Sequence, residues 1–233
     1  MKQVLELRLK EFLDKHPEIY KIGKTFRHKN SSHEIKLPKK FSPELCRLLG
    51  IIHGDGNMSY DRIVITDKCL EYHIIIQDLF EKVFSVKPNL FHDKKRHTYY
   101  SHIKRMVVYK FLVEVLEVPK GSIRRRLSTT SYMNLWDKKL KSSYLGGLFD
   151  SEGHVGKKQA KISFTITSKE IFDFVKNFLL ENGIKVSEYK RKRHEKPEYE
   201  IYIYGKQNIQ EMLKFVKFYH PDKVSRLKLF SSH

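Results

Sequence analysis

Two nine-residue segments, LLGIIHGDG at Leu48–Gly56 and LGGLFDSEG at Leu145–Gly153, decide the fold expected of this chain. Each is an apolar, helix-like run that ends in an acid followed by a glycine. The acids at the matching positions are Asp55 and Glu152, which are 97 residues apart (152 minus 55). A repeat at that spacing predicts a duplicated half-domain. Chemistry that uses two carboxylates is the first hypothesis that the repeat raises.

The predicted elements follow the same order in both halves. In the first half, Ser42 as N-cap and proline at the next position predict a helix to about His53, which Gly54 and Gly56 would end. The rest of this half is predicted as a strand at 62–66, a helix at 70–83, a hairpin at 89–106 and a helix at 107–118. The second half repeats the order with elements at 143–150, 161–167, 169–181, 184–204 and 208–218.

The expected fold is therefore a mixed α/β fold of two related halves. Residues 1–40 are expected to form a basic N-terminal extension, a helix followed by a linker. The first half-domain is expected at 41–123, a basic linker rich in serine and threonine at 124–141, and the second half-domain at 142–233.

The net charge of +19 points to an anionic partner, because uncompensated positive charge opposes compaction. Nucleic acid is the first candidate, and an anionic membrane surface is the alternative. The sequence has no run of about 18 apolar residues and no signal peptide, so we expect an intracellular, cytoplasmic protein that associates with the nucleoid through DNA and has no membrane partner. Cys46 and Cys69 lack the CxxC spacing of a zinc site and are expected to be buried thiols.

Small residues on the two repeated helices predict an unusually close contact between them. Gly50 and Gly54 lie four residues apart on one face, and Gly147 with Ser151 forms the counterpart. Parallel packing of these faces would bring the acids together at two helix C-termini, where negative charge is unfavourable by about 0.3–1 kcal/mol for each acid. A divalent cation such as Mg²⁺ would convert this repulsion into attraction and could bridge phosphate oxygens. The alternative is an ordinary buried helix whose terminal acid is solvated.

On these residues the chain resembles the LAGLIDADG homing endonucleases in their monomeric, two-motif form. The similarity covers about residues 36–220 and includes both motifs, their separation and the order of elements. It implies a pseudo-twofold fold whose two halves each run helix-strand-strand-helix-strand-strand-helix. The motif helices pack at the interface, and each half supplies a saddle-shaped antiparallel sheet for the DNA major groove. The two motifs differ at their sixth position, where Asp150 matches His53, which we interpret as structural.

The resemblance also implies the site residues. Asp55 and Glu152 are expected to be catalytic and to bind the metals, with the preceding Gly54 and Ser151 as further metal ligands. Basic groups near the scissile phosphates are the repeated Lys68 and Lys169, although each is equally well interpreted as a solvated lysine at a helix start. Mg²⁺ is the expected cofactor, with Mn²⁺ as a substitute.

Basic and aromatic residues of the predicted hairpins are candidates for contacts to DNA. By the two-residue period of a strand, Tyr189, Arg191 and Arg193 share one face. Contacts to base edges or to phosphates are both open for each candidate. The full set is Lys94, Lys95, Arg96, Lys104, Arg105, Lys157, Lys158, Lys161, Tyr189, Arg191 and Arg193.

The function expected from the sequence is a site-specific, magnesium-dependent endonuclease that hydrolyses one phosphodiester in each strand of double-stranded DNA. The protein is expected to be a monomer that acts in intron homing, encoded by a mobile intron or a freestanding gene. An intein is disfavoured because the sequence lacks a terminal His-Asn pair. Two alternatives remain: an intron RNA maturase or non-cleaving DNA-binding regulator on the same fold, or a basic protein associated with the ribosome or tRNA.

Overall fold

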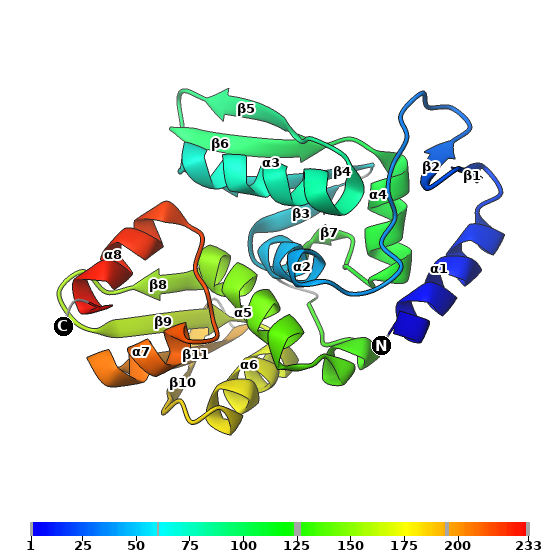
Figure 1. Cartoon of the computed structure of the whole chain (residues 1–233). Helices are drawn as coiled ribbons and strands as arrows, with labels where there is room; N and C mark the ends of the chain where they lie inside the picture. The colour runs from blue at the N-terminus through cyan, green and yellow to red at the C-terminus, as the bar shows by residue number, and fades with distance from the viewer. Residues whose placement is uncertain (1, 60, 124–126, 194–195, 232–233) are drawn as a thin grey trace.

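A computed structural model of the chain describes residues 2–59, 61–123, 127–193 and 196–231. Two α/β halves lie side by side, and the helices α2 (Pro43–Asp55) and α5 (Lys138–Glu152) meet between them (Figure 1). These helices carry the two repeated motifs. The expected pairing of the motif helices is therefore present.

Helix α2 begins as the sequence predicts. The Ser42 side chain accepts a hydrogen bond from the Leu45 N–H at 3.2 Å, and Pro43 occupies the first turn. The prediction that Gly54 ends the helix is wrong, because the helix continues to Asp55. Gly56 then adopts an extended conformation (φ −78°, ψ 149°) and opens β3 (Gly56–Ser59), a strand that the residue pattern did not indicate but that the expected helix-strand-strand order includes.

Helix α5 begins five residues earlier than the predicted Ser143. The Asp137 carboxylate accepts a hydrogen bond from the Leu140 N–H at 2.8 Å and caps the helix. Its first turn therefore lies in the segment expected to be a linker, which also contains the 3₁₀ helix Ser131–Leu135. Residues 124–126 of that segment lie outside the described residues.

The rest of the first half confirms the predicted order with two changes, an altered last helix and an additional short strand at its end. It contains β4 (Arg62–Asp67), α3 (Leu70–Phe84), β5 (Asn89–Asp93), β6 (Thr98–Ile103), α4 (Met106–Lys110), a π-helix (Phe111–Val115) and β7 (Gly121–Ser122). The last predicted helix is thus shorter than expected and changes from α to π. The strands form an antiparallel sheet in the order β5-β6-β4-β3-β7.

The second half repeats the arrangement. Its elements are β8 (Gly153–Val155), β9 (Lys161–Ile166), α6 (Lys169–Glu181), β10 (Ser187–Arg193), β11 (Lys196–Tyr204), α7 (Lys206–Leu213) and α8 (Pro221–Ser231). The antiparallel strand order is β10-β11-β9-β8. Helix α7 ends five residues before the predicted Phe218, and α8 was not predicted. The predicted duplicated α/β fold with antiparallel sheets is confirmed.

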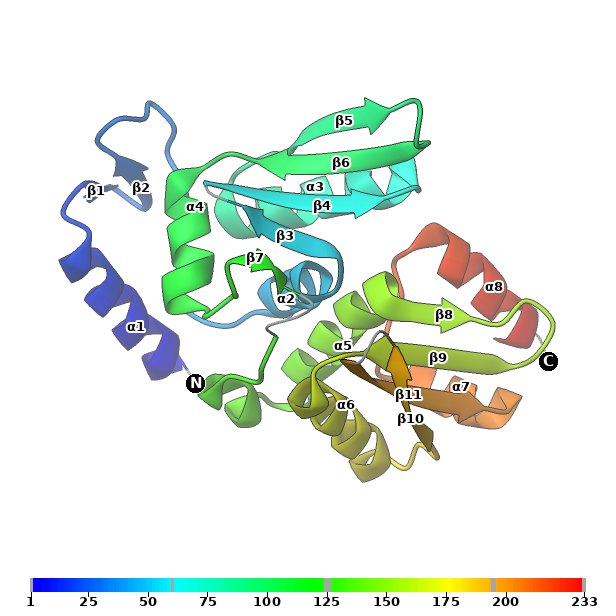
Figure 2. The same cartoon turned by 180° about the vertical axis from the view of Figure 1, so that it is seen from behind.

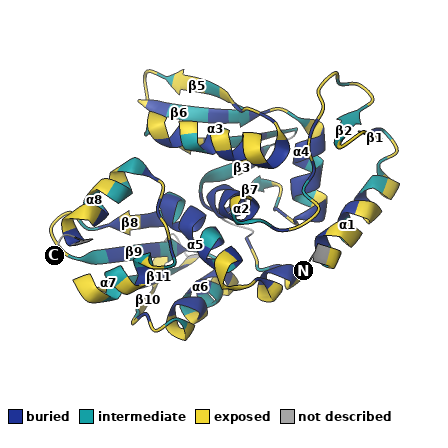
Figure 3. Ribbon diagram, in the orientation of Figure 1, coloured by how far each residue is buried: buried dark blue, intermediate teal, exposed yellow. Residues whose placement is uncertain are grey.

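Each sheet buries one face and leaves the other open. In the second half, Ile162, Phe164 and Ile166 of β9 and Ile201 and Ile203 of β11 are buried under helices. Figure 2 shows the opposite side, where strands of both halves face the viewer. The burial colouring in Figure 3 places the most continuous buried surface on α2 and α5, in the middle of the molecule.

The N-terminal extension packs on the first half. Helix α1 (Lys2–Lys15) buries Leu5, Leu9 and Phe12, and the Phe12 ring lies 6.4 Å from that of Phe111 in the π-helix. An unpredicted hairpin of β1 (Ile19–Ile22) and β2 (Thr25–His28) follows. No helix among the described ranges is long and apolar enough to cross a membrane.

Candidate active site

The two motif helices touch through their backbones. A Cβ atom added to Gly50 would lie 2.2 Å from the Tyr144 carbonyl oxygen, and one added to Gly147 would lie 2.1 Å from that of Arg47. No side chain can occupy either position at this separation. The close contact predicted from the small residues is present, and it fixes the relative position of the acids at the ends of the helices.

The two acids end their helices side by side. Asp55 is the last residue of α2 and Glu152 the last of α5. Between them Gly54 packs on the partner helix, because an added Cβ would lie 2.3 Å from the Ser151 Cβ and 3.3 Å from the Glu152 Cγ. This contact also explains why the helix passes through Gly54 instead of ending there.

Burial raises the pKa of the Asp55 carboxyl to about 6. The positive charge of Lys223 acts to lower this pKa, and the negative charge of Asp67 acts to raise it further. A smaller lowering comes from a hydrogen bond with Ser151. The carboxylate form of Asp55 is therefore destabilised at neutral pH and is poised to gain from an added cation.

Lys223 of α8 is the cation that the sequence analysis missed. Its ammonium donates hydrogen bonds to the carbonyl oxygens of Phe149 and Ser151, both at 3.0 Å, and to that of Asp150. It thus caps the C-terminus of α5, where a positive charge is favourable. Burial lowers the pKa of Lys223, while Asp150, Asp55, Asp67 and Glu152 act to raise it. The signal in the sequence was the helix start Pro221-Asp222, with the lysine in the first turn.

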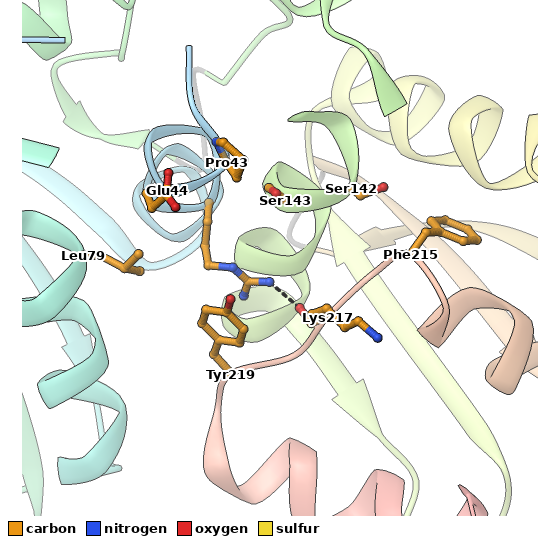
Figure 4. Close-up of a pocket in the computed structure, with 9 residues that line it drawn as sticks. Pro43, Glu44, Leu79, Ser142, Ser143, Phe215, Lys217 and Tyr219 are labelled. Atoms are coloured by element: carbon orange, nitrogen blue, oxygen red, sulfur yellow. Dashed lines mark hydrogen bonds between the residues drawn. The ribbon is translucent and has the colours of Figure 1, made fainter. Parts of the chain in front are cut away.

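A buried ion pair fastens the segment before α8 to the motif helices. The Arg47 Nη1 donates to Asp150 Oδ2 at 2.6 Å, and Asp150 also accepts from the N–H groups of Tyr219 (2.9 Å) and His220 (3.0 Å). The Arg47 guanidinium lies over the Tyr219 ring, with its Cζ 3.6 Å from the ring centroid, and donates to the Lys217 carbonyl. Figure 4 shows Lys217 and Tyr219 on the loop that joins α7 to α8 and passes the Arg47 side chain. The acid at the sixth position of the second motif is thus structural.

His53, at the same position of the first motif, is also structural, as predicted. Its Nδ1 lies 2.9 Å from the Tyr144 hydroxyl, and burial lowers its pKa to about 3, so the ring stays neutral. The two motifs therefore use different side chains at this position for the same purpose.

Asp67 and His220 join the two halves beside the acids. The His220 Nε2 lies 3.4 Å from Asp67 Oδ1, which also accepts a hydrogen bond from the Cys69 N–H at 2.6 Å. Burial acts to raise the pKa of Asp67, but these hydrogen bonds outweigh it and the pKa is lowered. Asp67 is therefore ionised at neutral pH and adds to the negative potential at Asp55.

The predicted catalytic lysines lie at the predicted junctions. Lys68 is exposed in the turn between β4 and α3. Lys169 is the first residue of α6 and forms an ion pair with Asp173 of the same helix. Their roles stay predictions, and the cation whose charge acts directly on Asp55 is Lys223.

The candidate DNA contacts fall into several groups. Lys94, Lys95 and Arg96 are exposed at the turn of the β5–β6 hairpin, whereas Lys104 and Arg105 follow the far end of β6. In the second half Lys157 and Lys158 are exposed between β8 and β9, and the Lys161 ammonium lies 5.0 Å from the Tyr202 ring centroid.

The open face of the second sheet carries aromatic and charged groups. Tyr189 is 64 % exposed and stacks edge-on against Tyr202. Arg191 pairs with Glu198 at 3.1 Å and with Glu200 at 2.8 Å, so its charge is largely neutralised within the sheet. The side chain of Arg193 lies outside the described residues.

The two carboxylates suit a divalent metal ion that is coordinated partly by the protein and partly by water and substrate. Within the described ranges, no three His, Cys, Asp or Glu side chains are grouped to hold a metal ion. Mg²⁺ characteristically takes only one or two protein carboxylates and completes its shell with water and substrate phosphates. The paired acids match that pattern, and the burial that raises the Asp55 pKa favours a cation beside it.

Comparison with known proteins supports this reading of the fold. A family model for the LAGLIDADG-like domain matches residues 139–217. A structure of the homing endonuclease I-DmoI in complex with DNA and Mn superposes with a TM-score of 0.55 and 19% identity, over 82% of this chain and 98% of that chain. The N-terminal LAGLIDADG domain of DUF199/WhiA gives a TM-score of 0.55 at 14% identity, over 80% of this chain and 88% of that chain.

Curated relatives match over most of the chain. From Methanocaldococcus jannaschii, a glutamine–fructose-6-phosphate aminotransferase is 26% identical over 201 residues, and a probable translation initiation factor IF-2 is 26% identical over 212 residues. These matches cover 84% and 83% of this chain but 18% and 16% of the relatives, so the chain spans less than a fifth of their length. By its paired motif helices, its sheets and these matches, the chain has the LAGLIDADG fold, and its residues 139–217 form a LAGLIDADG-like domain.

Proposed function

We propose that this protein is a site-specific endonuclease that hydrolyses one phosphodiester in each strand of double-stranded DNA with the help of divalent metal ions, Mg²⁺ or Mn²⁺. The observation that carries the proposal is the placement of Asp55 and Glu152 at adjoining helix ends. Two equivalent acids in a chain of +19 charge suit the two equivalent phosphates of a duplex.

Asp55 and Glu152 would hold the metal ions, with the Gly54 carbonyl beside them, whereas the Ser151 carbonyl that the sequence also suggested already accepts a hydrogen bond from Lys223. The bound ions would polarise the scissile phosphates and lower the pKa of a water molecule. Metal binding requires ionised Asp55, so activity should fall at acid pH, and the raised pKa of the metal-free carboxyl, about 6, brings this fall closer to neutral pH.

Lys223 prepares the site by neutralising charge. Its ammonium lies close enough to Asp55 and Glu152 for each acid to raise its pKa, and it holds the last carbonyls of α5 in place. It thereby limits the repulsion between the two carboxylates before substrate binds. A phosphate that approaches the pair meets one fixed positive charge within the protein.

The open sheet faces would receive the duplex. Basic side chains at the strand ends would neutralise phosphates, and the exposed Tyr189 and the partly exposed Lys161 would contact the groove. The two halves of one chain already supply both acids, so a monomer would suffice.

The test is cleavage of a randomised or genomic duplex library with Mg²⁺ and with EDTA, followed by sequencing of the ends. We expect discrete Mg²⁺-dependent breaks at one sequence. Asp55→Asn and Glu152→Gln should abolish double-strand cleavage and keep duplex affinity within a few-fold. Glu181→Gln, an exposed acid on α6, is the control and should cleave normally. Double-strand cleavage by either of the first two variants would exclude the paired-acid mechanism.

The second candidate function is a DNA-binding or RNA-binding protein that does not cleave, such as a regulator or a maturase. The observation in its favour is that Lys223 already places a positive charge at the acids. Absence of any break, combined with salt-sensitive binding to duplex DNA or structured RNA, would support it.

A further inference from the structure

A hollow of about 880 Å³ opens where the N-terminal hairpin meets the start of α2 and the end of α3. It lies at the opposite end of α2 from Asp55. A helix of 13 residues is about 20 Å long, so the hollow is well separated from the candidate active site. The chain entering α2 lies on the helical side of the molecule in Figure 1, whereas the strands face the viewer in Figure 2.

The rim of the hollow is strongly basic. The lining contains six exposed lysines, Lys21, Lys24, Lys36, Lys39, Lys40 and Lys82. Within the part of the chain that the structure describes, none of the six forms an ion pair or a side-chain hydrogen bond. Elsewhere Lys110 and Lys176 pair with acids. The lining contains one acid, Glu44. A concave surface lined by charges of one sign concentrates the potential and attracts an anion.

The floor of the hollow is apolar. Phe26, Leu37 and Val83 lie there, each at most 5% exposed, and Pro38 lies beside them. The N-terminus of α2, where the helix dipole is positive, borders the same hollow through Ser42. The site therefore combines an apolar floor with a basic rim.

We propose that this hollow binds a single-stranded segment of nucleic acid. Unpaired bases can turn away from their neighbours and lie on an apolar surface while the backbone follows a basic rim. A volume of 880 Å³ lies within the range of sites for ligands of nucleotide size and larger. A regular duplex keeps its base faces stacked and exposes only base edges and the backbone, so it would not use the apolar floor.

The test compares binding of fluorescently labelled 20-nucleotide oligo-uridine, oligo-thymidine and a 20-base-pair duplex by fluorescence anisotropy at several salt concentrations. In Lys36→Gln/Lys39→Gln/Lys40→Gln we expect single-strand affinity to fall by about tenfold and the salt slope to decrease by about 2, because each lost phosphate contact contributes about 0.7. Duplex affinity should change much less. The two single strands distinguish an RNA ligand from a DNA ligand.

The matched control is Lys139→Gln/Lys185→Gln/Lys206→Gln, which removes the same charge from three exposed lysines of the second half. It should bind the single strands like the wild-type protein. Glu44→Gln, which removes the only acid of the lining, should instead strengthen single-strand binding. Equal losses in the two triple variants, or an equal loss for the duplex, would overturn the proposal.

Discussion

Replacing Asp55 with asparagine should make the metal-free protein more stable while it abolishes cleavage. Burial raises the pKa of this carboxyl from 3.8 to about 6, so folding disfavours its ionised form. A shift of about two units corresponds to about 3 kcal/mol. Because Asp55 is only half-buried, solvent screening reduces this figure, and we expect a gain of about 1–2 kcal/mol in the free energy of unfolding at pH 7.5.

The sign of the pH dependence is fixed by the raised pKa. Well below pH 3.8, the ordinary pKa that applies in the unfolded chain, the carboxyl is protonated in both states and the wild-type protein carries no penalty. The penalty grows as pH rises through the window from 3.8 to about 6 and is complete above it. The advantage of Asp55→Asn over wild type should therefore be full at pH 7.5 and fall to a small part of that at pH 4.

Thermal unfolding in EDTA at both pH values measures this difference. For a chain of this size, we expect Tm of Asp55→Asn to exceed that of wild type by about 3–6 °C at pH 7.5. Glu44→Gln, at the N-terminus of the same helix, should shift Tm slightly downward, because it loses a favourable interaction with the helix dipole. A Tm at or below that of wild type at pH 7.5, or a gain at pH 4 as large as the gain at pH 7.5, would refute the reasoning.

Three further substitutions probe the packing around the site. Lys223→Met should raise the Asp55 pKa above 6, because the Lys223 charge lowers that pKa in the wild-type protein. The acidic side of the pH profile of cleavage should therefore move to higher pH. An unchanged profile would contradict the role of Lys223. Gly147→Ala should lower the free energy of unfolding by more than about 3 kcal/mol in urea titration, because its Cβ meets backbone at 2.1 Å, whereas Ser143→Ala on the same helix should be nearly neutral. Arg47→Met should lower the free energy of unfolding by about 3–5 kcal/mol, because the buried Asp150 carboxylate loses its ion-pair partner. The double variant Arg47→Met/Asp150→Leu should recover much of this loss. Additive losses of the two single substitutions would contradict the pairing.

The features set by local sequence were predictable. Ser42 and Pro43 mark a helix start by their own chemistry, and the small residues Gly50, Gly54 and Gly147 mark a close helix contact. The duplicated order of elements followed from the periodicity of the apolar residues in each half.

The features set by tertiary contacts were missed. Gly54 stays helical because Ser151 packs against it, which no local rule contains. Lys223 belongs to the site because Asp150 anchors the backbone of Tyr219 and His220 from 69 and 70 residues away. Strand β3 has only four residues and begins immediately after a helix, so its alternation is too short to be recognised, and only the order of elements implied by the resemblance includes it.

The capping of α5 by Lys223 has a consequence for synthesis of the protein. The ribosome produces Asp55 first, Glu152 97 residues later, and Lys223 after a further 71 residues (223 minus 152). At roughly 5–20 residues per second, several seconds separate the second acid from the lysine. During that interval α2 and α5 can meet, but the last carbonyls of α5 have no ammonium donor and Asp55 lacks the positive charge of Lys223. Assembly of the site is thus directional, and the complete charge arrangement exists only in a chain whose C-terminal helix has folded back onto the motifs.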